Sequence, residues 1–341
     1  MLMLSSTIAV GTEKVYATGW RSWLRFCTEF KLAALNPPEH VLCAFVAWLA
    51  TPTAARKRGL AVSTVRNYLS GIAHGHVMRG LPSPTADLAL LRRVTKGHMR
   101  WRGIHTKQKR PITIGLLALI AGVVDRSDAV QSTVFDALCL GVHGLIRLGE
   151  LLPRPSGDRS PMTRAAAYFA PGGMHASLFL PVSKSDPFGA GARVHLFASR
   201  DSTCPIAALH RLLAVPGTPS MPLLRHGDKA LSRDLFITTI RSFIARVETK
   251  YGLRLRAREF AGHSMRRGGA TSLSNRGVPS HFIQWLGRWK SDTYKIYIDY
   301  APEAVLHWLG HLANSPDDIL RRDLSASLRP PTSPPEWLGT D

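Results

Sequence analysis

A run of basic residues separates two groups of amphipathic segments, and this division is the feature that most restricts the fold. The run, 92–110, reads RRVTKGHMRWRGIHTKQKR and contains eight Lys or Arg residues and no acidic residue. A chain of 341 residues is long enough for two domains that each bury a core. We therefore expect a first domain at 1–105 with a basic linker near 92–110, a second domain at 111–312, and a flexible, Pro-containing tail at 313–341.

Before the basic run, apolar residues recur at helical spacing. The spacing predicts helices over 12–31, 38–50, 62–79 and 84–100, with Thr12 as the N-cap of the first. Successive helical patterns without a strand pattern between them are typical of a helical bundle. The first domain is therefore predicted to be a small all-α bundle.

After Pro111 the pattern is helical again, with one interruption. Two short alternating segments, 175–182 and 193–197, flank SKSDPFGAGA, whose Asp-Pro and Gly residues favour a hairpin loop. The predicted helices are 113–125, 129–146, 204–214, 231–250, 264–276, 279–286 and 291–300. The expected fold class is mainly α with a small antiparallel β-sheet.

The charge of the chain points to a polyanionic partner. The formal net charge is +21, and the sequence pI is about 10.6. Residues 1–110 hold 17 Lys/Arg and 4 Asp/Glu, a balance of +13, which leaves 27 and 19, a balance of +8, for 111–341. Nucleic acid is the leading candidate partner, an acidic membrane surface is the second, and the first domain is expected to make most of the contacts.

Other sequence features exclude some classes of protein. No run of apolar residues is long enough for a transmembrane helix, and the apolar start of the chain lacks the basic residues of a signal peptide, so we expect neither membrane insertion nor secretion. The four Cys residues lack metal-ligand spacing and are expected to be free thiols. No Walker loop, zinc pattern or carboxylate cluster for magnesium is present, so we expect no cofactor and no metal site.

Three charged residues in the second domain need an explanation. In GLIRLGELL, 144–152, Arg147 and Glu150 interrupt an apolar helical pattern. An unpaired buried charge is costly, so the pair forms either an internal ion pair or a functional arginine oriented by an acid. Lys184 lies in the predicted hairpin loop, where it is either solvated or able to reach a neighbouring cleft as a proton donor.

Two later motifs add candidates. In GHSMRRGGATSLSNRG, His263 and Arg266 share one helix face, and they either begin a polar helix or hold a phosphate, while Arg267 points to another face. In LGRWKSDTYKIYIDY, Arg288 and Trp289 precede tyrosines at 294, 297 and 300, a spacing that is most often core packing.

Taken in order, these motifs resemble those of the tyrosine recombinase (phage integrase) family. The matching segments are GLIRLGELL, the Lys184 hairpin, GHSMRRGGATSLSNRGVP and LGRWKSDTYKIYI, and the resemblance covers about 110–305. HSMRRGGAT and LGRWKSDTYKIYI look most like recombinases of DIRS-type retrotransposons and related eukaryotic mobile elements. The first domain is similar to the family's SAM-like core-binding domain in pattern only. The resemblance implies an α+β integrase-like catalytic domain after it.

The resemblance also implies a role for each matched residue. Arg147 and Arg266 match the arginines that hold the scissile phosphate, and Tyr297 matches the nucleophile. Lys184 matches the lysine that protonates the leaving 5′ oxygen, and His263 matches a general acid/base. Glu150 matches the acidic residue that follows the first arginine. The family usually has His or Trp where this chain has Arg288, so either Arg288 or its neighbour Trp289 fills that position.

These residue types suit phosphoryl transfer without a metal. Guanidinium groups can bind a phosphate through two hydrogen bonds each, and a tyrosine of pKa about 10 becomes a useful nucleophile when its anion is stabilised. The resemblance implies site-specific DNA integration or excision through a 3′-phosphotyrosyl intermediate, by a homotetramer on two double-stranded DNA sites with a dimer on each. The expected DNA-contacting residues are Arg66, Arg92, Arg93, Lys96, Arg100, Arg102, Lys107, Lys109, Arg110 and Arg267.

Two alternatives remain open at this point. A type IB topoisomerase uses the same chemistry with strand rotation, and a domesticated DNA-binding protein keeps the fold without activity. A mobile-element origin in a eukaryote would imply action in the nucleus, and another origin would imply the cytoplasm or nucleoid.

Overall fold

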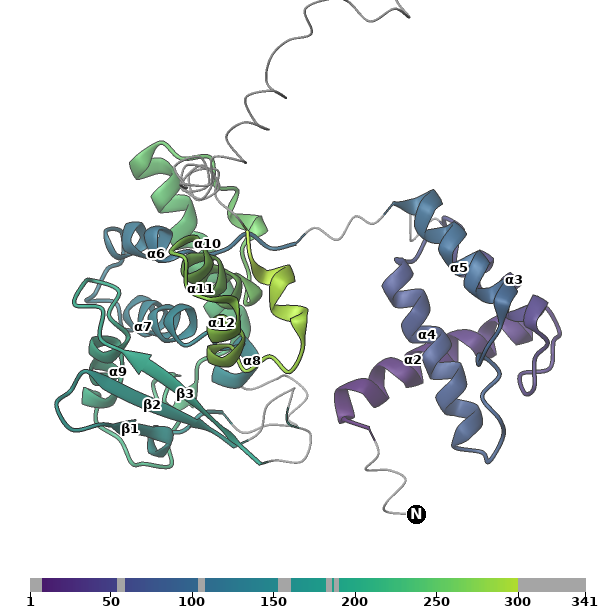
Figure 1. Ribbon diagram of the computed structural model, residues 1–341, viewed down its shortest axis with the longest axis horizontal. Coiled ribbons are helices and arrows are strands. Elements are labelled where there is room, and N and C mark those ends of the chain that lie inside the picture. Colours follow the sequence, from purple (N-terminus) through teal and green to yellow (C-terminus); the bar gives the residue numbers. More distant parts are fainter. Residues whose placement is uncertain are drawn as a thin grey trace, which may run out of the picture. The chain divides into compact units, whose positions relative to one another are not determined.

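The chain forms two compact units whose boundary lies between Gln108 and Lys109, seen in Figure 1. The computed structural model describes residues 8–53, 59–103, 108–152, 161–181, 186 and 190–299. Two residues with predicted roles, Lys107 and Lys184, lie outside the described residues, as do Tyr300 and the predicted tail.

The first unit is built from four described helices: α2 Val10–Glu29, α3 Glu39–Ala50, α4 Val62–Val77 and α5 Ala89–Arg102. Trp23 and Phe26 of α2 share one face and meet Phe45 of α3 in the core. Helices α2 and α4 approach closely because of glycine: a Cβ on Gly19 would lie 2.7 Å from the Cα of Tyr68. The predicted cap is wrong, because α2 begins after Ala9 and Thr12 lies inside it.

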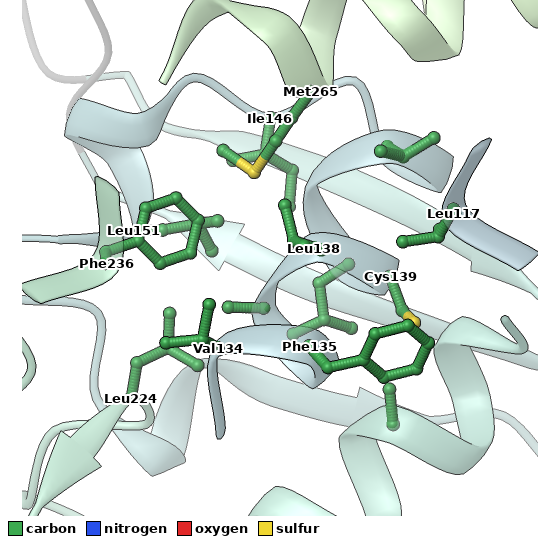
Figure 2. Packing of buried hydrophobic residues seen from close by; sticks show 14 of the residues in the cluster. Leu117, Val134, Phe135, Leu138, Cys139, Ile146, Leu151, Leu224, Phe236 and Met265 are labelled. Carbon is green, nitrogen blue, oxygen red and sulfur yellow. The ribbon is translucent and has the colours of Figure 1, made fainter. Parts of the chain in front are cut away.

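The second unit surrounds one buried helix. Helix α7, Ala129–His143, is buried without interruption from Val134 to Val142, so it has no solvent-facing side over those residues. Figure 2 shows Phe135, Leu138 and Cys139 of this helix packed among Leu117 and Phe236 from neighbouring helices. The other helices are α6 Ile114–Ala121, α8 Leu148–Leu151, α9 Pro205–Ala214, α10 Arg233–Tyr251, α11 His263–Asn275 and α12 Ser280–Leu286. Three short 3-10 helices complete them: η1 Arg164–Ala166, η2 Ala257–Glu259 and η3 Asp292–Tyr297.

A three-stranded antiparallel sheet covers one side of this core. Its order is β1 Ala167–Phe169, β2 His175–Leu180 and β3 Ala192–Phe197. In the β2–β3 pair, His175 lies opposite Phe197, and alternate residues such as Leu178 and Leu196 face the core. The predicted fold class and the two strands of the hairpin are confirmed. Strand β1 and a small hairpin, β4 Arg225–His226 with β5 Lys229–Ala230, were not predicted because they are too short for a clear alternating pattern.

The predicted helix over 129–146 is wrong at its end, and this difference creates the candidate site. Helix α7 stops at His143, Gly144 follows as its C-cap, and Leu145 adopts a left-handed conformation with φ 46°. Arg147 then precedes the separate short helix α8. The segment predicted as a helix at 291–300 is likewise a 3-10 helix over its first part.

Three further observations concern the described residues only. None of their helices is both long and apolar enough to cross a membrane. They contain no group of three His, Cys, Asp or Glu side chains placed to hold a metal ion. All four cysteines are described, and all are free thiols.

Candidate active site

The predicted catalytic residues of the second unit come from separate segments that meet beside the end of α7. Arg147 and Glu150 lie at α8, Arg266 lies on α11, Arg288 follows α12, and Tyr297 ends η3. Contacts among α7, α11, α12 and η3 bring these segments together. A single site therefore forms from residues up to 150 positions apart.

Glu150 holds two of the arginines. Its carboxylate accepts hydrogen bonds from the guanidinium of Arg147 at 2.7 Å and from that of Arg288 at 3.1 Å. It also accepts the backbone N–H of Arg147 at 2.9 Å, which fixes the start of α8. Burial alone would raise the pKa of Glu150, but Arg288 and Arg147 outweigh it, so the pKa is lowered and the group is an anion at neutral pH.

Arg266 is the most deeply buried charge of the site. Its side chain is inaccessible to solvent, and its guanidinium donates to the carbonyls of Leu145 and Gly287. The guanidinium also lies over the Trp289 ring, 3.9 Å from the ring centroid. Burial, together with the like charges of Arg147 and Arg288, lowers the pKa of Arg266 to about 9, so it remains a cation at neutral pH.

The sequence left open whether Arg288 or Trp289 fills the position where tyrosine recombinases usually have His or Trp. In the structure the two residues make different contacts. Arg288 points toward Glu150, and its guanidinium also donates to the carbonyls of Gly144 and Leu145, each at 3.4 Å. Trp289 instead turns inward and packs on Arg266, Tyr294 and Tyr297. The polar contact thus belongs to Arg288, and Trp289 supports Arg266 from one face.

The backbone around this cluster is strained. Both Leu145 and Arg288 have positive φ, 46° and 57°, which side chains larger than glycine rarely adopt. Such conformations cost about 1–3 kcal/mol each and persist where the surroundings require them. Here the strain turns the carbonyl of Leu145 toward two guanidinium groups.

Tyr297 lies at the edge of the arginine cluster. Its ring is half-buried, 5.4 Å from the Trp289 ring, and the guanidinium of Arg266 lies 5.9 Å from its centroid. Tyr294 is buried in a small apolar cluster with Leu145 and Ile283, which suits a packing role. Of the two described tyrosines in this motif, Tyr297 is therefore the more accessible one.

The structure says less about the two remaining predicted catalytic residues, His263 and Lys184. His263 is the first residue of α11 and is exposed, one turn from the buried Arg266. Lys184 belongs to the loop between β2 and β3, outside the described residues.

Basic side chains line a groove in the first unit. Its lining includes Arg66 of α4 and Arg92 and Lys96 of α5, with Leu91 at its floor, around a cavity of about 710 Å³. Arg93 and Arg100 of α5 are also exposed. The apolar face of α5 packs inward, so its basic face is left to solvent.

Four other predicted DNA contacts have partners inside the protein. Arg102 donates to the carbonyl of Gly59 at 2.7 Å, Lys109 to that of Arg258, and Arg110 to those of Arg254 and Leu255. Arg267 is buried and pairs with Asp299, which follows η3, and it donates to the carbonyl of Ile296 at 3.0 Å. Its position therefore differs from the exposed face expected for it.

Sequence reasoning missed the residues that fix η3. Thr271, one turn after Arg267, donates its hydroxyl to the carbonyl of Tyr297 and accepts the N–H of Asp299 at 3.1 Å. Its spacing of four from Arg267 places both on one helix face, which was the available signal. Nothing local in the sequence indicates that Asp299 is their partner.

Comparison with known proteins gives one sequence relative and several structural ones. No family model matches the chain. The "Integrase/recombinase xerD homolog" of Selenomonas ruminantium is 25% identical over 294 residues, which span 85% of this chain and 81% of the relative.

The solved structures share the fold at low sequence identity. A lambda integrase dimer bound to a COC′ core site has a TM-score of 0.56 and 16% identity, over 88% of this chain and 93% of that one. The Tn1549 transposon integrase in complex with transposon right end DNA has a TM-score of 0.52 and 12% identity, over 89% and 99%. The chain therefore shares the fold of these integrases and is similar in sequence, over most of its length, to one integrase/recombinase.

Proposed function

We propose that this protein is a site-specific DNA recombinase that cuts and rejoins DNA through a 3′-phosphotyrosyl intermediate. The observation that carries the proposal is the arginine cluster, in which Arg147 and Arg288 both bind the carboxylate of Glu150 and Arg266 lies close by, next to Tyr297. Three guanidinium groups and one carboxylate leave a local surplus of positive charge. A phosphate, which carries negative charge, would neutralise that surplus.

Unsatisfied donors support an anion as the ligand. Within the described part of the chain, the buried Nε atoms of Arg266 and Arg288 have no hydrogen-bond partner. A buried donor without a partner is costly, so such atoms are expected where a ligand completes the site. The pKa of Arg288 is lowered by burial, and a bound anion would favour its charged form.

The burial of the three arginines implies the order in which a phosphate would contact them. The side chains of Arg147 and Arg288 are 20% and 12% exposed, whereas Arg266 is inaccessible beneath Trp289. A phosphate would therefore meet Arg147 and Arg288 first. Contact with Arg266 would require Trp289 or η3 to move, which we expect when DNA binds.

The chemistry follows from the residue types. The Tyr297 oxygen attacks phosphorus, a P–O bond forms to Tyr297, and the bond from phosphorus to the 5′ oxygen breaks. His263 takes part in proton transfer, and Lys184 supplies a proton to the leaving 5′ oxygen. The arginines stabilise the charge that develops on the phosphate. Because the phosphotyrosyl ester keeps the energy of the broken bond, rejoining needs neither ATP nor a metal ion.

The basic groove of the first unit is proposed to bind the DNA backbone. Arg66, Arg92 and Lys96 line it, and phosphate contacts of this kind supply affinity without sequence preference. The lambda integrase relative is a dimer on its core site. By analogy, we propose a dimer on each of two double-stranded DNA sites, forming a tetramer. An origin in a DIRS-type mobile element, and with it a nuclear site of action, remains a prediction from the motif spellings.

A covalent trapping assay tests this function. The full chain is incubated with nicked duplexes drawn from its flanking genomic DNA, and adducts that resist SDS are digested and mapped. An adduct on Tyr297 that is absent from Tyr297→Phe supports the proposal. Tyr294→Phe serves as the matched control and should keep the adduct.

Two results would contradict the proposed function. Tight, salt-sensitive DNA binding without any adduct across several sites would identify a DNA-binding protein without activity. If the protein forms the adduct and relaxes supercoiled DNA but never joins two sites, it is a topoisomerase.

A further inference from the structure

A row of five neighbouring rings lies beside the arginine cluster and extends across the outer face of the sheet. It runs from Phe282 and Trp285 of α12 to His195 and Phe197 of β3, by way of His175 of β2. Neighbouring ring centroids lie 5.5 Å apart for Phe282–Trp285, 5.6 Å for Trp285–His195, 5.3 Å for His195–His175 and 4.9 Å for His175–Phe197. We call these residues the aromatic row.

The row is a built surface rather than a set of scattered apolar residues. The Trp285 and His195 rings are within 14° of parallel, and the two histidine rings are within 18°. The histidines also share a hydrogen bond of 3.0 Å, which fixes both imidazoles. Trp285 nevertheless remains 57% exposed and Phe197 54% exposed, so large ring surfaces stay in contact with water.

The row adjoins the proposed catalytic cluster. The carbonyl of Trp285 accepts the backbone N–H of Arg288 at 2.9 Å, so the row begins one turn from the arginine that binds Glu150. A molecule bound at the Trp285 end of the row would therefore lie near the arginine cluster.

Charge favours nucleic acid over an apolar protein surface as the partner. Arg193 shares the outer face with His195 and Phe197, and its guanidinium lies 5.9 Å from the Phe179 ring. The described residues of β2, β3 and α12 include no Asp or Glu. Aromatic rings interleaved with cations are the combination that binds single-stranded nucleic acid by stacking.

His195 fits this use because its environment favours the neutral imidazole. Burial, aided by the positive charges of Arg193 and Arg288 and by His175, lowers the pKa of His195. At neutral pH its imidazole is therefore an uncharged flat ring. Such a ring can stack on a base without the cost of covering a charge.

We propose that the aromatic row binds unpaired nucleobases of the DNA next to the cleaved bond, so that the preferred substrate carries a bulge or a single-stranded segment. In a continuous duplex both faces of each base are covered by its neighbours, so only an unstacked base can use these rings. This inference rests on the proposed function, whose substrate class it narrows.

Binding of the full chain to three probes tests the proposal. They are a paired duplex, the same duplex with one bulged 2-aminopurine, and a single strand containing 2-aminopurine, whose fluorescence falls when the base stacks. We expect the bulged duplex to bind about tenfold more tightly than the paired one, with quenching. Trp285→Ala and Phe197→Ala should each remove the preference and the quenching and leave paired-duplex affinity unchanged, whereas Trp285→Phe should keep both.

Tyr251→Ala is the matched control, because Tyr251 is an exposed aromatic residue at the end of α10, outside the row. Equal affinity for bulged and paired duplexes, or an equal loss on both in Trp285→Ala, would overturn the proposal. A change in sedimentation of Trp285→Ala without any change in bulge preference would also overturn it and assign the row to contact between copies of the chain.

The adduct assay separates this inference from the proposed function. An adduct on Tyr297 without bulge preference would reject the aromatic row alone. Bulge preference without any adduct would reject the recombinase reaction and leave the row as a binding surface.

Discussion

The carboxylate of Glu150 accepts a hydrogen bond from the guanidinium of Arg288 at 3.1 Å, across 138 positions of the sequence. This contact joins α8 to the turn after α12. Since Glu150 also binds Arg147, one buried anion holds two cations while a third, Arg266, lies close by. The carboxylate of Glu150 thus holds the site together. Its single negative charge does not neutralise the three positive charges of the arginines.

Replacing Glu150 with Gln should destabilise the second unit by about 3 kcal/mol at neutral pH, because two buried guanidinium groups lose their anion. The pKa of Glu150 is lowered in the folded protein. Its stabilising effect is therefore present above the ordinary Glu pKa of about 4.3 and is lost as the pH falls through the lower folded value. Denaturant unfolding of both proteins across pH should show the difference shrinking in acid. A constant difference would mean that the charge of Glu150 is not what matters.

The site should also respond to anions. Inorganic phosphate should raise the melting temperature of Glu150→Gln more than that of the unmodified protein, because the variant has a larger surplus of charge. Melting in phosphate and in chloride at equal ionic strength gives the measurement. An equal response of the two proteins would argue against anion binding at the arginine cluster.

Arg267→Gln should impair cleavage rather than DNA binding. Arg267 pairs with Asp299 and thereby holds the segment that ends in Tyr297, so its loss should lower the rate of adduct formation about 10²-fold through misplacement of the nucleophile. The salt dependence of duplex binding should not change. Arg93→Gln is the contrasting variant, and its salt slope should fall by about 0.9. A reduced salt slope in Arg267→Gln would instead support the predicted contact between Arg267 and DNA.

Removing the charges of the basic groove should weaken binding to all DNA sequences alike. Arg66→Ala, Arg92→Ala and Lys96→Ala should each reduce the slope of log K against log salt by about one, because each removes one phosphate contact. Titrations at several salt concentrations provide the measurement. Arg25→Ala, an exposed arginine of α2 that does not line the groove, is the control. Equal slopes in the groove and control variants would place the DNA elsewhere.

Gly268→Ala should prevent close packing of α11. A Cβ at this position would lie 1.7 Å from the carbonyl oxygen of Ile112, and a backbone atom cannot move aside easily. We expect a loss of about 3 kcal/mol or more in the unfolding free energy of the second unit. Gly97→Ala in α5 meets nothing within 4 Å and should stabilise the first unit by about 0.5–1 kcal/mol. Similar effects of the two changes would contradict this account.

Local patterns predicted most elements, and their failures have physical causes. Helices α3 and α9 lie close to the predicted ranges, since their apolar spacing is regular. The end of α7 was misjudged because 144–152 continues the apolar pattern, and a left-handed residue at Leu145 leaves no periodic signal. The positions of Thr271 and Asp299 were missed because their pairing joins separate elements.

The sequence by itself determined that the chain is basic and mainly helical, it predicted a division between 105 and 111, and it supplied arginine, histidine and tyrosine motifs that resemble those of tyrosine recombinases. Only the tertiary structure decided that Arg266 is buried against Trp289, that Arg267 turns inward to Asp299, and that Arg288 binds Glu150. Spacing along a chain reports which residues share one face of one element. The partner and burial of a charged side chain depend on which other elements pack there, and that depends on contacts between residues far apart in sequence.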